Sequence, residues 1–212
     1  MIILVRHGES ETNKFIHDDI ADKDTAINAI GDPHLTALGK IQAKETGDFL
    51  AKTLNGKKVI VNTSPFTRTL ETCTHFCKIY GDNFIDFHKN TELLEWTPLR
   101  KKLTQTHIEQ GLKHDVSWDV FESRVKNYAK SIEDGIDRVV FGHSLFFTAL
   151  TAHLASQREW FPKEDQMCFE IPNCSITVLE KKQNRWTVHH VSSIAHLSPS
   201  SVSGIHSNFG YK

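Results

Sequence analysis

Two histidines and two arginines in this chain have residue types and settings suited to binding and attacking a phosphate group. Arg6 and His7 directly follow a short apolar run near the N-terminus. His143 follows a second such run, and Arg68 lies shortly after a third. A guanidinium matches phosphate oxygens with paired hydrogen bonds, a neutral imidazole can attack phosphorus, and a protonated imidazole can neutralise charge on the phosphoryl oxygens. These residues predict phosphoryl transfer, with a different role for each histidine.

Apolar runs and amphipathic segments alternate along the chain and indicate an α/β fold. A buried strand is predicted at 2–5, further short strands at 59–61, 84–87 and 139–141, and an edge hairpin at 175–180 and 186–191. Helices are predicted from about 36 to 56, 66 to 80, 117 or 119 to 131, and 144 to 155. This alternation implies a mostly parallel sheet covered on both faces, with its ligand site beyond the carboxyl ends of the strands. The polar clusters at 6–9, 64–68 and 142–144 are therefore expected to converge.

Capping signals mark the starts of two of these helices. Ser64 is expected to cap a helix whose first turn contains Pro65. Ser117 or Asp119 is expected to cap the helix that ends near 131. The buried side of that helix is predicted to carry Val120, Phe121, Val125, Tyr128 and Ile132.

Three segments carry weaker periodicity. Residues 14–34 are rich in aspartate and are predicted to form a long loop, which in compact domains is often functional. Residues 96–114 are basic and irregular, with a short helix expected near 106–111. The tail at 198–212, rich in serine and glycine, is expected to be loosely attached.

Composition excludes several classes of partner. The 212 residues are 39% hydrophobic and 24% charged, which suits a single globular domain. Lys and Arg number 25 against 26 Asp and Glu, so no surplus positive charge is available for nucleic acid or an anionic membrane. The apolar run of five residues at the N-terminus is too short for a signal peptide or a membrane span. We therefore expect a cytoplasmic protein with no nucleic-acid or membrane partner.

Neither the cysteines nor the histidines have the spacing of a metal site. The four cysteines, Cys73, Cys77, Cys168 and Cys174, form no C-x-x-C pair, and the 13 histidines form no H-E-x-x-H motif. Cys73 and Cys77 are expected to be two small buried side chains on one helix. The sequence predicts no metal and no cofactor.

Several segments resemble the histidine phosphatase superfamily, which also contains the cofactor-dependent phosphoglycerate mutases. Residues 6–13, Arg-His-Gly-Glu-Ser-Glu-Thr-Asn, match its R-H-G-E-[ST]-x-x-N opening, and 35–39 are similar to its L-T-x-x-G helix start. Residues 64–72 resemble its S-P-x-x-R-[AT]-x-x-T segment. Residues 139–144 are similar to the strand before its second histidine, and 173–177 to its late edge strand.

This resemblance runs in order over nearly the whole chain, and it implies both fold and partners. The expected fold is one domain, 1–212, a three-layer α/β/α sandwich with a mostly parallel central sheet. A helical insertion is expected around 96–133, and the loose tail at 198–212. The expected substrate is a phosphorylated small molecule or a phosphoprotein, with homo-oligomers left open.

The resemblance also assigns roles to residues. His7 would take the phosphoryl group, and Arg6, Arg68 and His143 would form the phosphate pocket. Asn13 would add an amide donor to this pocket. The reaction would need no metal, because these side chains supply the charge.

The proton donor of the family is a glutamate in an L-x-E segment. Glu95 matches best, and Glu92 is the alternative. A general acid must be protonated when the leaving group departs and ionised when it activates water. A partly buried carboxyl group with a raised pKa is therefore expected.

Two departures from the family pattern bear on function. Ser144 follows the second histidine, where the family usually has glycine. The chain also lacks the Arg-Arg pair of phosphoglycerate mutases and has only the basic cluster at 100–102, which favours a phosphatase over a mutase. The sequence Leu-Leu-Glu-Trp at 93–96 resembles the corresponding segment in the branch of the family that contains protein tyrosine phosphatase domains.

Three other functions remain alternatives to a phosphatase. The first is a phosphoglycerate mutase-type phosphoryl transferase, and the second is a module that binds phosphorylated ligands without turnover. The third is a serine hydrolase with Ser144 as nucleophile, because residues 142–146 begin like a G-x-S-x-G elbow. This last alternative fails at Phe146, where the elbow requires a small residue.

Overall fold

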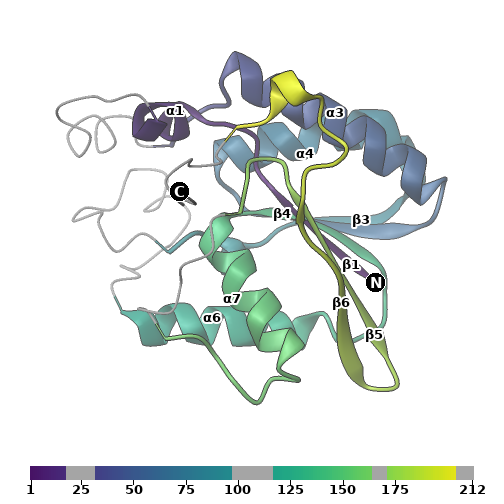
Figure 1. Ribbon diagram of the computed structural model, residues 1–212. Helices are drawn as coiled ribbons and strands as arrows, with labels where there is room; N and C mark the ends of the chain where they lie inside the picture. Colours follow the sequence, from purple (N-terminus) through teal and green to yellow (C-terminus); the bar gives the residue numbers. More distant parts are fainter. Residues whose placement is uncertain (18–31, 97–116, 164–170, 204–212) are drawn as a thin grey trace, which may run out of the picture.

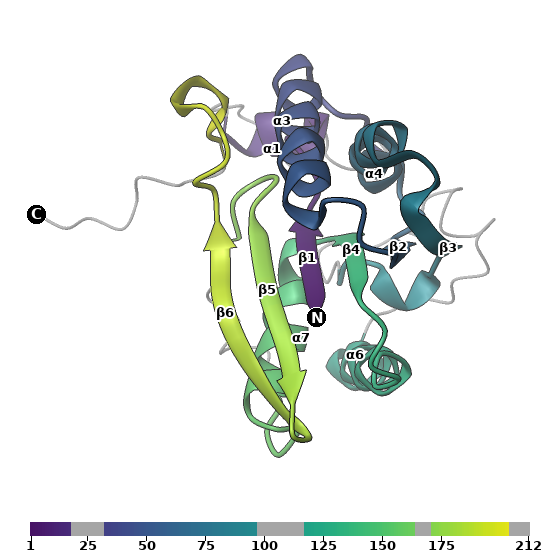
Figure 2. The same cartoon turned by 90° about the vertical axis from the view of Figure 1, so that its right-hand side faces the viewer.

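A central sheet of six strands organises this computed structural model, which describes residues 1–17, 32–96, 117–163 and 171–203. The strands are β1 (Ile2–Arg6), β2 (Val59–Thr63), β3 (Phe84–Lys89), β4 (Arg138–Gly142), β5 (Ile176–Lys182) and β6 (Arg185–Ser193). Their order is β3-β2-β4-β1-β5-β6 (Figure 2). The first four are parallel, and β5 and β6 add an antiparallel hairpin. The mostly parallel sheet is therefore confirmed.

Helices cover both faces of this sheet. Figure 1 shows α3 (Ala37–Leu54) and α4 (Thr67–Tyr80) on one face, and α6 (Trp118–Ser131) and α7 (Ser144–Ala155) on the other. A short helix, α1 (Glu11–His17), follows β1. This arrangement confirms the α/β sandwich. Among the described residues, no helix is long and apolar enough to cross a membrane.

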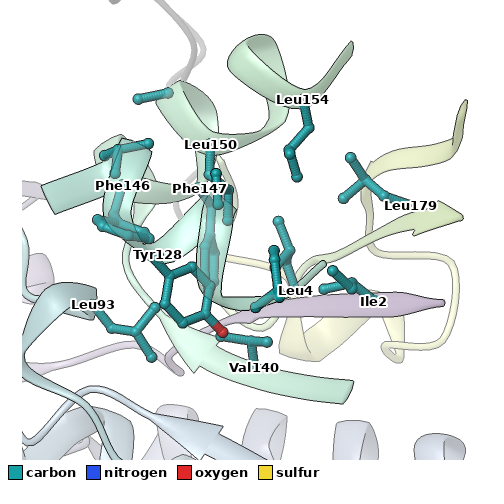
Figure 3. Close-up of a cluster of buried hydrophobic side chains, with 14 of the residues drawn as sticks. Ile2, Leu4, Leu93, Tyr128, Val140, Phe146, Phe147, Leu150, Leu154 and Leu179 are labelled. Carbon is teal, nitrogen blue, oxygen red and sulfur yellow. The ribbon is translucent and has the colours of Figure 1, made fainter. Parts of the chain in front are cut away.

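The core is built on both sides of β1. Ile2 and Leu4 enter the cluster beneath α6 and α7. Ile3 and Val5 enter the cluster beneath α3 and α4, because alternate residues of a strand point to opposite faces. Figure 3 shows the first of these clusters, which includes Tyr128, Phe146, Phe147, Leu150 and Leu179. An uninterrupted apolar run is typical of a strand that is buried on both faces.

Two helix starts follow their capping residues. The Thr36 hydroxyl accepts a hydrogen bond from the Gly39 amide at 3.0 Å, which fixes the start of α3. The Ser117 hydroxyl accepts one from the Val120 amide at 3.3 Å, so Ser117 and not Asp119 caps α6. Helix α7 has the predicted bounds.

The expected cap of α4 is wrong. This helix begins at Thr67, and the Asp32 carboxylate accepts a hydrogen bond from its amide, with the nearer oxygen at 3.0 Å. The Ser64 hydroxyl is instead 2.8 Å from Nε2 of His143. The Asp32 carboxylate therefore has the capping role that was expected of Ser64. Its negative charge also stabilises the positive N-terminal end of the helix.

Three further expectations need correction. Val120 is 46% exposed, so the buried side of α6 is narrower than predicted. Residues 14–17 belong to α1 and not to a loop. The first part of the tail is attached, because Ser201 is buried and the Ser198 hydroxyl donates to Glu45 at 2.8 Å. The short helix expected at 106–111, most of the loop at 14–34 and the end of the tail lie outside the described residues.

The predicted edge hairpin is confirmed, and its two-residue turn explains how β5 and β6 pair next to the turn. Gln183 and Asn184 connect β5 to β6 with φ values of 49° and 64°. Two consecutive left-handed residues form the tight turn that matches the twist of antiparallel strands. Asn tolerates this conformation better than most residues other than glycine.

Candidate active site

The four parallel strands end at one edge of the sheet, and each end delivers a polar side chain. His7 follows β1, Ser64 follows β2 and His143 follows β4. Glu95 comes shortly after β3. The His7 amide donates to the Gly142 carbonyl at 3.0 Å, so the ladder between β1 and β4 continues up to the site. The predicted convergence of the polar clusters is confirmed.

Arg68 joins the two histidines. Its Nε donates to Nε2 of His7 at 3.2 Å, and its Nη2 lies 3.2 Å from Nδ1 of His143. The two imidazole rings meet edge to face, with centroids 5.3 Å apart. All three side chains are buried. A guanidinium between two imidazoles is therefore held beyond the strand ends, where a phosphate could accept its hydrogen bonds.

The backbone fixes the tautomer of His7. Its Nδ1 lies 2.7 Å from the carbonyl oxygen of Gly8, which can only accept a hydrogen bond. Nδ1 therefore carries the proton in the neutral ring, and Nε2 has the lone pair. Nε2 is thus the nitrogen that could attack phosphorus.

The surroundings of both histidines lower the pKa of each ring and so favour its neutral form. Burial lowers the pKa of His7 well below its usual value, and the positive charges of Arg68 and Arg6 lower it further. Burial and the Arg68 charge also lower the pKa of His143. A neutral His7 suits the expected nucleophile. The lowered pKa of His143 disfavours a protonated ring, so a charged His143 would need the negative charge of a phosphate beside it.

Arg6 and Asn13 are held by the segment around Asn173. The Arg6 guanidinium donates to the Ile171 carbonyl, and the side-chain amide of Asn173 donates to the His7 carbonyl at 3.1 Å. The same amide donates to Oδ1 of Asn13 at 3.1 Å. The carbonyl of the Asn13 side chain is therefore occupied by protein partners. Its role as a phosphate donor stays a prediction.

Glu95 lies at the N-terminus of α7. Its carboxylate oxygens accept hydrogen bonds from the Leu145 and Phe146 amides, both at 3.2 Å. Burial raises the pKa of Glu95, and the charges of Arg68 and Arg6 partly oppose this shift. The carboxyl group is therefore within the electrostatic reach of Arg6 and Arg68, and its raised pKa suits a general acid.

Glu92, the alternative acid, has different neighbours. Burial raises its pKa, and the opposing charge comes from Arg124 on α6. Arg124 donates to the carbonyl oxygens of Glu92 and Leu94, both at 2.8 Å, so it holds the backbone just before Glu95. The geometry therefore favours Glu95 over Glu92.

Two side chains that hold the turn after His7 were given no role in the sequence analysis. The Gly8 amide donates to the Thr72 hydroxyl at 3.0 Å, and the Glu9 amide to the Gln42 side chain at 2.7 Å. Thr72 and Gln42 are buried. Their contacts join segments 64 and 33 residues apart. Thr72 is the last residue of the segment at 64–72 that resembles the family motif, but the motif does not show which group it contacts, and Gln42 lies in none of the quoted motifs.

Ser144 is not placed as a nucleophile. Its hydroxyl accepts a hydrogen bond from the Ile171 amide at 3.2 Å. The neighbouring His143 has its two ring nitrogens bonded to Arg68 and Ser64, so it is not oriented as a base for Ser144. The arrangement does not support a serine hydrolase.

The described cysteine thiols and candidate metal ligands form no metal site. Cys73 and Cys77 lie side by side on α4 with their sulfur atoms 3.7 Å apart, and both are free thiols. Within the described ranges, no group of three or more His, Cys, Asp and Glu side chains could hold a metal ion. Cys168 and the basic cluster at 100–102 lie outside those ranges.

Comparison with known proteins gives a match to one family model. The family model of the histidine phosphatase superfamily (branch 1) matches residues 2–194. No curated protein is similar enough in sequence to count as a match.

Solved structures share the fold. A phosphoglycerate mutase from Bacillus anthracis str. Sterne is 17% identical, with a TM-score of 0.63, over 92% of this chain and 93% of the other. The ecdysone phosphate phosphatase from Bombix mori, solved with tungstate, is 19% identical, with a TM-score of 0.63 over 90% and 92%. The alpha-ribazole phosphatase from Shigella flexneri is 16% identical, with a TM-score of 0.62 over 91% and 96%. At these identities the likeness establishes the fold alone.

Proposed function

The chain belongs to the histidine phosphatase superfamily (branch 1), and we propose that it hydrolyses phosphate monoesters through a phosphohistidine at His7 without a metal. The observation that carries the proposal is the Arg68 guanidinium bonded to both His7 and His143. Phosphate oxygens are better acceptors for these donors than neutral imidazoles, because they carry negative charge. A bound phosphate would therefore recruit Arg68 and release the lone pair on Nε2 of His7.

The first chemical step forms the phosphoenzyme. Nε2 of His7 attacks phosphorus in line with the ester oxygen, so the N–P bond forms as the P–O bond breaks. Glu95 gives its proton to the departing oxygen, which leaves as an alcohol. Arg6 and Arg68 neutralise charge on the remaining phosphoryl oxygens.

The second step releases phosphate. Glu95, now ionised, takes a proton from a water molecule whose oxygen attacks phosphorus. The N–P bond breaks, the electron pair returns to Nε2 of His7, and inorganic phosphate leaves. Glu95 is protonated again and His7 is neutral, so the cycle closes.

The proposed substrate is a phosphorylated small molecule or a phosphoprotein. Two of the proteins with this fold are named for phosphate esters of unrelated alcohols, ecdysone and alpha-ribazole. The described part of the site recognises the phosphoryl group, which such substrates share. A screen of sugar phosphates, nucleotides and phosphopeptides would identify the alcohol.

A trapping experiment tests the function. The protein is mixed with an aryl phosphate labelled in the phosphoryl group and quenched in denaturant. Wild-type protein should carry an acid-labile, alkali-stable label, as expected for phosphohistidine, and His7→Ala should carry none and lose turnover by several orders of magnitude. His190→Ala, at an exposed position on β6, is the matched control and should behave as wild type.

The outcomes separate the rival functions. Near-normal turnover in His7→Ala would disprove the phosphohistidine. Binding of phosphate esters with no release of phosphate and no label would indicate a binding module. Transfer of label to a second position of a phosphoglycerate, in place of release as phosphate, would indicate a mutase.

A further inference from the structure

We propose that Ser64 is a positioning residue that, together with Arg68, holds His143 in the tautomer with its proton on Nε2, so that the ring presents the lone pair of Nδ1 to the phosphate site. Ser64 follows β2, and its hydroxyl oxygen lies 2.8 Å from Nε2 of His143. The tautomer itself does not depend on the proposed function. The effect of this tautomer on the reaction rate does rest on the proposed function.

Donor and acceptor chemistry fixes the tautomer. An arginine guanidinium has only donors, so His143 must accept through Nδ1 from Nη2 of Arg68, 3.2 Å away. A neutral imidazole carries one N–H, and that proton is therefore on Nε2. Nε2–H then donates to the Ser64 hydroxyl oxygen. The opposite tautomer would place two N–H groups against each other at Nδ1 and leave Nε2 to accept from Ser64.

Burial makes Ser64 hard to replace in this role. Both Ser64 and His143 have 0% exposed surface, so bulk water cannot reach Nε2 when the hydroxyl is removed. The backbone of Ser64 is also fixed, because its amide donates to the Phe141 carbonyl at 2.9 Å. The Thr69 hydroxyl donates to the Ser64 carbonyl at 2.8 Å. A buried donor without its acceptor is costly, so the ring of His143 should reorient when Ser64 loses its hydroxyl.

This orientation has a use in phosphate binding. A phosphate ester carries one or two negative charges near neutral pH. The proton of a bound monoanion can pass to Nδ1 of His143, which leaves a dianion beside an imidazolium and conserves the charge of the pair. Ser64 still accepts from Nε2–H in that state, so the ring need not turn between the two protonation states. The new Nδ1–H then donates to a phosphoryl oxygen.

The tautomer can be measured directly by 15N NMR of protein labelled in the histidine rings, with His143 assigned by the loss of its signals in His143→Gln. Wild type should show a protonated Nε2 and an unprotonated Nδ1. Ser64→Ala should shift His143 toward the other tautomer or a mixture, and Ser64→Thr, which keeps the hydroxyl, should restore the wild-type pattern.

Ser175→Ala is the matched control. It also removes a buried hydroxyl next to the site, but this hydroxyl has no hydrogen-bond partner within the described part of the chain. It should leave the tautomer of His143 unchanged. The same shift in Ser175→Ala as in Ser64→Ala would overturn the specific role of Ser64.

The rate of phosphorylation provides a second test of the role of Ser64. In single-turnover experiments with an aryl phosphate, Ser64→Ala should lower the phosphorylation rate about tenfold, the scale of one lost buried hydrogen bond, with little change in KM. Ser64→Thr should recover most of this loss.

Two results would overturn the proposal. The first is a wild-type His143 that is protonated on Nδ1, which can be seen even if Ser64→Ala fails to fold. The second is a folded Ser64→Ala protein with unchanged tautomer and rate. A wild-type protein without phosphatase activity would overturn the proposed function instead, and the NMR measurement would still decide the role of Ser64.

Discussion

The backbones of Gly8 and Gly39 meet with no room for a side chain on either residue. A Cβ at Gly8 would lie 2.5 Å from the Gly39 carbonyl oxygen, and a Cβ at Gly39 would lie 2.0 Å from the Glu9 carbonyl oxygen. The Thr36 amide donates to that same Glu9 oxygen at 2.9 Å. The first turn of α3 is thus in direct contact with the turn that carries His7.

Gly39→Ala should therefore destabilise the protein and reduce its activity. Overpacking of this kind costs about 1–3 kcal/mol, and here both contacting groups are backbone atoms. The measurement is urea unfolding beside Gly47→Ala, a change in the same helix where the new Cβ would lie 3.1 Å from the Phe76 amide nitrogen, a milder conflict that should cost less stability. Replacing glycine by alanine favours the helix to a similar extent at both positions. Equal free energies of unfolding for the two variants would therefore show that the close contact at Gly39 does not destabilise Gly39→Ala.

Much of the scaffold can be predicted from local sequence. Ser117, one of the two expected candidates, caps α6, and Thr36 lies at the predicted start of α3. Four apolar runs became the four parallel strands, and this alone brings His7 and His143 to one edge of the sheet. Polar residues that follow parallel strands can be predicted to meet, because the carboxyl ends of such strands lie at the same edge of the sheet.

Contacts between distant segments could not be predicted. Ser64 has the residue type and position of a helix cap, but its hydroxyl bonds to His143, 79 residues away. Asn173 supports the His7 carbonyl across 166 residues. Val120 fits the apolar pattern of α6, yet its side chain is 46% exposed. In each case tertiary packing decides between local options that are close in free energy.

Hydrolysis of an alkyl phosphate should be fastest on the acidic side of neutrality. The pKa of His7 is lowered from 6.5, so the nucleophile stays neutral in mild acid. The pKa of Glu95 is raised from 4.5, so its proton remains available at higher pH than in an ordinary glutamate. The value of kcat/KM should fall as pH rises through the Glu95 pKa. A rate that keeps rising into the alkaline range would contradict this assignment.

Chelators should not affect the rate. Arg6 and Arg68 supply the positive charge that a cation would otherwise bring to the phosphoryl oxygens. Initial rates measured before and after dialysis against a chelator should agree. Activity that is lost on dialysis and returns only with zinc, manganese or magnesium would show that the arginines do not suffice.

Removing the carboxyl group of Glu95 should affect two substrates unequally. An alkyl phosphate needs a proton on its leaving oxygen, whereas an aryl phosphate with a good leaving group scarcely does. Glu95→Gln should slow the chemical step of the alkyl substrate on the order of a hundredfold or more, and aryl phosphorylation distinctly less. Because the same group would activate water, the aryl reaction should show a burst followed by slow turnover. Glu92→Gln is the matched control: a strong unequal loss there, or equal losses on both substrates in Glu95→Gln, would move the acid away from Glu95.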